Sequence, residues 1–130
     1  VYKRQVLERA ARYSKERVTF GHPICENQAI AFKLAEMATE IEVARAMLYN
    51  TARMSDNGVP FSKEATMCKM FCSEMCVRVC DMGLQIMGGY GLCNEYEVER
   101  FYRDAKLLTI GEGTSEICRM VVGRHVLKEY

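Results

Sequence analysis

The chain has 130 residues, of which 49% are hydrophobic and 27% are charged, and its formal net charge at pH 7 is +1. This is the composition of an ordinary globular domain with a modest core. The small net charge and the lack of an apolar run of transmembrane length argue against a nucleic-acid-binding protein and a membrane-spanning one.

Apolar residues repeat at helical spacing through most of the chain, which predicts an all-α protein. We expect five helices, near residues 6–20, 26–55, 62–87, 95–108 and 114–128. Glycine, proline and asparagine residues, which favour turns, mark their boundaries. No stretch alternates with period two for long enough to predict a strand. Because long helices joined by short loops fold back on each other, we expect an up-and-down four-helix-type bundle with a short closing helix pair.

Cysteine is unusually frequent, with seven residues. Four of them recur at every fourth position, as Cys68, Cys72, Cys76 and Cys80. On a helix this spacing gives one stripe, whereas metal sites usually need closer pairs and further ligands. We interpret the stripe as small packed side chains in a reducing compartment, and we predict no metal site.

The stretch RDAKLLTIGEGTSE at residues 103–116 reads as a helix end, a glycine loop and a helix start. Glu112 lies between two glycines, where a ligand can approach closely. Thr114 or Ser115 occupies the N-cap position, so the carboxylate precedes a helix N-terminus that favours negative charge. A solvated glutamate in a helix–loop–helix joint is the plainer interpretation.

Two other patterns stand out, RVTFG at residues 17–21 and QIMGGYG at residues 85–91. By themselves they read as a cation at a helix end and as a glycine helix stop. A charged set near the end of the fourth helix, Arg100 with Arg103 and Asp104, is interpreted as local ion pairs.

These three motifs resemble those of the acyl-CoA dehydrogenase family, where the usual forms are RxxFG, QxxGGxG and RDAK…IYEGT. The resemblance runs from about Ala10 to Leu127, in the family's order and spacing. Asn27 stands where many members have His, and Gly111 where they commonly have Tyr. The resemblance implies that residues 1–130 are one carboxyl-terminal helical domain, of a protein that also has an amino-terminal helical and a middle β-domain. We expect this chain to be inactive alone.

The resemblance also implies an activity, namely the oxidation of an acyl-CoA thioester to the 2,3-enoyl-CoA with FAD as hydride acceptor. In the family's pattern Glu112 is the catalytic base that removes the α-proton, and Gly111 and Gly113 lie near the substrate. The positions implied for cofactor binding are Arg17, Val18, Thr19, Phe20, Gln28, Gln85, Ile86, Met87, Gly88, Gly89, Thr114, Ser115 and Glu116.

The partners implied by the resemblance are an acyl-CoA substrate, further copies of the chain in a homotetramer or homodimer, and an electron-transfer flavoprotein. We expect a cytoplasmic protein, with the mitochondrial matrix as the alternative. An enoyl-CoA reductase, a flavin monooxygenase-like relative and a non-catalytic helical oligomerisation module are the alternative functions. The acyl chain, the direction of the reaction and the electron acceptor stay open.

Overall fold

The computed structural model describes residues 2–130, with side chains from residue 3 onward. Its α-helices are α1 (Tyr2–Glu16), α2 (Gln28–Asp56), α3 (Ser62–Met87), α4 (Val98–Leu107) and α5 (Ser115–Glu129). A hairpin of β1 (Val18–Thr19) and β2 (His22–Pro23) follows α1, and 3-10 helices occupy Ile24–Glu26, Gly88–Leu92 and Asn94–Tyr96. The predicted all-α class is confirmed, with this hairpin as a small addition.

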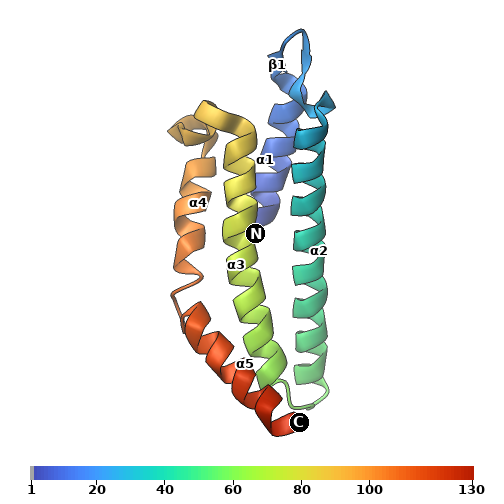
Figure 1. Cartoon of the computed structure of the whole chain (residues 1–130), viewed down its shortest axis with the longest axis vertical. Helices are drawn as coiled ribbons and strands as arrows, with labels where there is room; N and C mark the ends of the chain where they lie inside the picture. The colour runs from blue at the N-terminus through green and yellow to red at the C-terminus, as the bar shows by residue number, and fades with distance from the viewer. Residues whose placement is uncertain (1) are drawn as a thin grey trace.

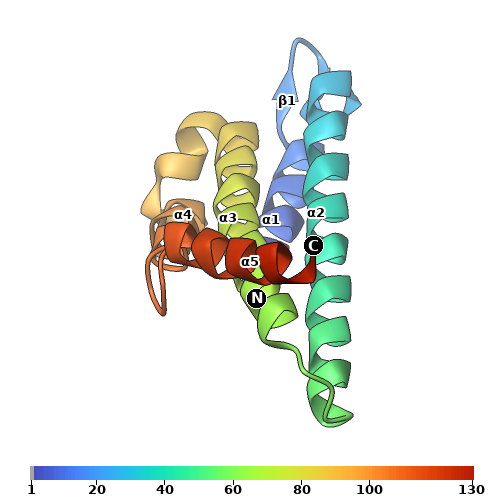
Figure 2. The same ribbon diagram turned by 60° about the horizontal axis from the view of Figure 1, so that its bottom comes forward.

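Helices α1 to α4 run alternately up and down, and α5 crosses the lower part of the bundle (Figures 1 and 2). The central element is α3, which contacts each of the other α-helices. Its inner face buries Met75 and Val79 completely, against Met37 of α2 and Val6 of α1. Burying side chains of this size stabilises the fold by roughly 1.5–3 kcal/mol each.

The first predicted helix is wrong at both ends, because α1 begins at Tyr2 rather than at residue 6 and stops at Glu16, and residues 18–23 form the hairpin. The strands pair Val18 with Pro23 and enclose a turn in which Phe20 and Gly21 have φ values of 52° and 90°. Two consecutive left-handed residues make the type of turn that matches strand twist. Phe20, which lies within the first predicted helix, is fully exposed at the tip of this turn.

Two other helix starts also differ from the prediction. A 3-10 turn precedes α2, which therefore begins at Gln28 rather than near 26. The start of α4 moves from 95 to Val98, since Glu97 has a φ of 60° and a left-handed residue cannot continue a right-handed helix.

Arg100 and Arg103 of α4 make local ion pairs as predicted, with glutamates rather than with Asp104. Arg103 lies 2.7 Å from Glu99 within the helix, and Arg100 lies 3.3 Å from Glu97. The guanidinium of Arg9 also contacts Glu97, which joins α1 to the start of α4. No helix in residues 2–130 is both long and apolar enough to cross a membrane.

The close approach of α1 to α3 at Gly83 gives a stability prediction. A Cβ at Gly83 would lie 2.2 Å from Cγ1 of the buried Val6. We therefore expect Gly83→Ala to lower the free energy of unfolding by about 1–3 kcal/mol, measured by urea denaturation. In the control Gly123→Ala, within α5, a Cβ meets nothing within 4 Å, so a gain of about 0.5–1 kcal/mol is expected from helix propensity. A Gly83→Ala variant as stable as the parent would contradict the packing described here.

Candidate active site

A cavity of about 580 Å³ lies between α3 and the loop that joins α4 to α5. Glu112 and Gly111 line it on the loop side, where the resemblance places the base and a substrate contact. The remaining lining residues come from α1, α3 and the end of α4, and they are Lys3, Lys69, Cys72, Ser73, Cys76, Leu107 and Leu108.

The loop is built by local hydrogen bonds at both of its ends. After α4, the amides of Ile110 and Gly111 both donate to the carbonyl of Leu107, at 3.0 and 2.8 Å. The amide of Ser115 donates to the carbonyl of Thr109 at 3.0 Å, which brings the two ends of the loop together. Glu112 therefore lies at the apex of a short, tightly closed turn.

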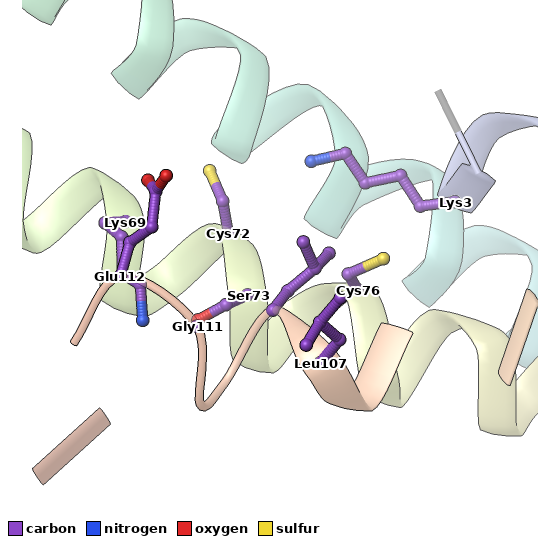
Figure 3. Close-up of a pocket in the computed structure, with 9 residues that line it drawn as sticks. Lys3, Lys69, Cys72, Ser73, Cys76, Leu107, Gly111 and Glu112 are labelled. Carbon is purple, nitrogen blue, oxygen red and sulfur yellow. The ribbon is translucent and has the colours of Figure 1, made fainter. Parts of the chain in front are cut away.

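Glu112 has a φ of 54°, a conformation that residues with a side chain rarely adopt. Its carboxylate makes no hydrogen bond or ion pair with any residue in the described range 2–130. Figure 3 shows this carboxylate standing clear of the loop, on the same side as the sulfur of Cys72. A strained residue with an unpaired acid at a cavity wall is an arrangement associated with function.

The α3 wall of this cavity was not predicted from the sequence. Lys69, Cys72, Ser73 and Cys76 follow one another at steps of three, one and three, which places them on one helix face. That spacing was the available signal, although the cysteines were interpreted only as packed side chains. Cys76 is indeed buried, yet it also contributes to the cavity surface.

The thiols of α3 differ in their ionisation. The hydrogen bond between Cys76 and Cys80 lowers the pKa of Cys76, with help from the Lys3 ammonium, and raises the pKa of Cys80. Burial raises the pKa of Cys68 to about 11. No group of three or more potential metal ligands occurs within residues 2–130. The stripe therefore carries thiols of different acidity and offers no metal site among the residues described.

A second cavity, of about 530 Å³, lies at the other end of α3 between the hairpin and the loop at residues 88–92. It gathers several of the predicted cofactor positions, which are Arg17, Thr19, Ile86, Met87, Gly88 and Gly89. The guanidinium of Arg17 lies 5.5 Å from the centre of the Tyr90 ring. No carboxylate within residues 2–130 pairs with it, so its donors are free to meet an anion.

The other predicted positions of this group lie nearby without lining the cavity. Val18 and Phe20 are exposed on the hairpin, Gln28 is exposed at the start of α2, and Gln85 is exposed in the last turn of α3. All of these segments lie at the upper end of the bundle (Figure 1). The structure thus brings the motifs at residues 17–21 and 85–91 together at one end of the bundle.

The third set of cofactor positions lies apart from them, at the start of α5. Thr114, Ser115 and Glu116 line a crevice of about 190 Å³ beside the loop. Along α3, Glu74 in this crevice and Met87 in the second cavity are separated by a rise of about 20 Å. The predicted cofactor residues therefore belong to two separate places on the chain.

The residues of the second cavity and those at the start of α5 suit FAD, the cofactor that the resemblance implies. In the second cavity, a Cβ at Gly88 or Gly89 would meet nothing within 4 Å, so the backbone there is open to a ligand beside the Arg17 guanidinium. This donor set fits a pyrophosphate. At the start of α5, the buried hydroxyl of Ser115 has no hydrogen-bond partner within the described residues. A buried donor without a partner is unusual and fits a polar group of a ligand.

Comparison with known proteins assigns the chain to a family. A family model described as the acyl-CoA dehydrogenase C-terminal domain matches residues 2–127. The chain is 53% identical over 122 residues to the probable acyl-CoA dehydrogenase YngJ of Bacillus subtilis (strain 168), covering 94% of this chain and 32% of that protein. It is 47% identical over 123 residues to the caffeyl-CoA reductase-Etf complex subunit CarC of Acetobacterium woodii, covering 95% of this chain and 32% of that protein.

A solved structure agrees with these relatives. The chain is similar to butyryl-CoA dehydrogenase from Megasphaera elsdenii with a TM-score of 0.94 and 44% identity, covering 97% of this chain and 33% of that one. The chain thus spans about one third of the length of the proteins that it matches.

The N-cap of α5 gives a prediction about the loop. The hydroxyl of Thr114 accepts a hydrogen bond from the amide of Ile117 at 3.4 Å. The backbone amide of Glu116 and the Thr114 hydroxyl hold the pKa of Glu116 below its usual value. We expect Thr114→Ala to lower the free energy of unfolding by about 1 kcal/mol and to raise the pKa of Glu116 toward its usual value, as followed by NMR titration.

A carboxyl group whose pKa is lower in the folded state than in the unfolded state stabilises the fold at neutral pH. Glu116 therefore adds to the free energy of unfolding at neutral pH, and this contribution is lost as the pH falls through the folded-state pKa. Thr114→Ser keeps the acceptor oxygen and serves as the matched control. An unchanged pKa of Glu116 in Thr114→Ala would show that the hydroxyl does not act on this carboxyl.

Proposed function

Because the chain belongs to the acyl-CoA dehydrogenase family, we propose that the protein containing it oxidises an acyl-CoA thioester to the 2,3-enoyl-CoA, with Glu112 as the base. The observation that carries the proposal is the position of Glu112. Its carboxylate is unpaired within residues 2–130 and lines the first cavity from the apex of a strained loop. The motif around it is the one in which the family carries its base.

Glu112 would act on the α-carbon of the thioester. This C–H group is weakly acidic, so its proton leaves only when a base is held close and oriented. The base takes the proton, and the electron pair of the C–H bond moves into the forming double bond. The neighbouring Gly113 has a φ of 103° and no side chain, which leaves its backbone open to the thioester. The apolar part of the cavity, with Leu107 and Leu108, would exclude water from the acyl group.

The second cavity and the start of α5 would hold FAD. When bound, FAD supplies the acceptor for the β-hydride. Arg17 would donate to the pyrophosphate, while the Ser115 hydroxyl would donate to another polar group of the cofactor, with Thr114 and Glu116 lining the crevice beside it. Because the second cavity and the crevice at the start of α5 are about 20 Å apart along α3, we propose that they serve cofactors of two different subunits, in a homotetramer or homodimer. The fully exposed Phe20 beside Arg17 supports a covering neighbour.

The reverse reaction is a second candidate, favoured by the relative from Acetobacterium woodii, which is named as a subunit of a caffeyl-CoA reductase-Etf complex. In an enoyl-CoA reductase the same carboxyl group would deliver a proton to the α-carbon, by microscopic reversibility. The name of that relative also supports an electron-transfer flavoprotein as the redox partner of this protein. We further propose that residues 1–130 form a single carboxyl-terminal domain.

Replacing the base tests the proposed function. In the FAD-loaded native polypeptide that contains this chain, we expect Glu112→Gln to slow anaerobic flavin bleaching by saturated acyl-CoAs about 10²- to 10⁴-fold. The fold should be kept, because the Glu112 carboxylate has no partner to lose in the described chain. Glu95→Gln, at an exposed position that lines neither cavity, is the control. Bleaching by Glu112→Gln at the parent rate would refute the assignment.

Gly111 gives a prediction about the acyl group. It stands where the family commonly has Tyr, and a Cβ there would lie 3.4 Å from the Leu107 carbonyl oxygen, an ordinary contact distance. A tyrosine ring at this position would occupy part of the cavity. We expect Gly111→Tyr to lower kcat/KM for branched or aryl acyl groups about tenfold or more relative to short straight chains, as measured with a substrate panel.

The variant Gly111→Ala adds a side chain without a ring and is the matched control. An unchanged preference in Gly111→Tyr would mean that this wall of the cavity does not face the acyl group.

A further inference from the structure

We propose that Lys69, in the amino-terminal third of α3, is the positioning residue for Glu112, because it anchors the loop that carries this carboxylate. The ammonium of Lys69 donates a hydrogen bond to the backbone carbonyl of Gly113, the residue directly after Glu112. The two positions are 44 residues apart in the sequence. The catalytic consequence of this contact rests on the function proposed above, whereas the anchoring itself does not.

The loop needs an anchor because its conformation is costly. Glu112 and Gly113 are consecutive residues with positive φ, at 54° and 103°. A left-handed conformation costs a residue with a side chain a substantial free energy, and it persists only where the surroundings hold it. At Gly113 the absence of a side chain removes this cost, but it also leaves the backbone with more freedom to lose. The geometry of Glu112 is therefore imposed from outside the two residues.

The other hydrogen bonds of the loop are local and hold only its ends. They join Leu107 to Gly111, Thr109 to Ser115 and Thr114 to Ile117, all within α4, the loop and the first turn of α5. Within residues 2–130, the hydrogen bond from Lys69 is the one that joins loop residues 108–114 to a different helix. The local hydrogen bonds determine the conformation of the loop, and the contact from Lys69 determines its position relative to α3.

Lysine is suited to this role by its length and chemistry. Its four-carbon stem can run along the cavity wall while the ammonium reaches the loop, and the ammonium offers three donors. A hydrogen bond from a charged donor is stronger than one between neutral groups. Figure 3 shows the nitrogen of Lys69 and the carboxylate of Glu112 pointing in opposite directions. Lys69 thus contacts the backbone of the loop while the carboxylate stays free for a substrate.

Buried residues flank Lys69 on α3. Cys68 precedes it directly, and Ser73 lies one turn further along the helix. On the far side of the loop, α5 is tied to the same helix by the pair of Arg119 and Glu74, whose N and O atoms are 2.5 Å apart. Movement of Glu112 relative to the cavity therefore requires the Lys69 contact to break.

The loss of this anchor would act on the rate more than on binding. A base displaced by about 1 Å from its reactive position can lose about 10²-fold in rate, although the other residues that line the substrate cavity stay in place. Removing an interaction that is needed only in the transition state lowers kcat and leaves KM almost unaltered.

The test compares Lys69→Met, Lys69→Arg and Lys63→Met in the FAD-loaded native polypeptide. Lys63 is the matched control, since it is another α3 lysine with a contact to the carboxyl-terminal part, 2.5 Å from a carboxylate oxygen of Glu129, and it lines neither cavity. Two readouts are needed, hydrogen exchange of the amides in residues 109–115 and the separate kcat and KM values for an acyl-CoA.

In Lys69→Met we expect the loop amides to exchange about 10-fold faster or more, and kcat to fall about 10- to 100-fold with KM changed less than about threefold. Lys69→Arg keeps a charged donor and should recover most of both properties. Lys63→Met should change neither readout.

If the amides of residues 109–115 exchange no faster in Lys69→Met than in Lys63→Met, Lys69 does not anchor the loop. Faster exchange with an unchanged kcat would overturn the positioning role while keeping the anchor. If the parent shows no turnover with any acyl-CoA or enoyl-CoA, the proposed function fails, and the exchange readout alone then decides whether Lys69 anchors the loop.

Discussion

The packing of every other helix against α3 is the constraint on which the structure depends. This one helix contributes residues to the core and to both cavities. Its amino-terminal half lines the first cavity, and its carboxyl-terminal end, next to Gly88 and Gly89, lines the second. A shift of α3 as a whole would therefore alter the lining of both cavities. The small side chains along it, such as Gly83 against Val6, allow the neighbouring helices to approach closely enough for this arrangement.

The loop after α4 shows how a helical bundle can present a reactive group. A side chain within a helix is fixed to one face of that helix, whereas the left-handed Glu112 lies in the loop outside both α4 and α5. Local hydrogen bonds define the turn, and its position depends on a contact from α3. Strain at this residue is compensated by the rigidity of the bundle, which is the usual condition under which strained residues persist at functional sites.

The sequence predicts those parts of the structure whose causes are local. The bounds of α3 follow from its apolar periodicity between Pro60 and Gly88, and Thr114 caps α5 as its position indicates. The hairpin at 18–23 was missed, because two-residue strands are too short to show alternation. Lys69 was missed for a different reason, since a lysine that donates to a distant backbone carbonyl leaves no pattern in the sequence. The roles of the site residues remain predictions.

Removal of the α-proton by Glu112 can be measured in the absence of hydride transfer. An acyl-CoA analogue with sulfur in place of the β-carbon has no β-hydrogen to lose, so only the proton step remains. In D₂O, the FAD-loaded native polypeptide should exchange the α-protons of this analogue for deuterium, and Glu112→Gln should not. Exchange by Glu112→Gln at the parent rate would contradict the account and assign the proton transfer to another group.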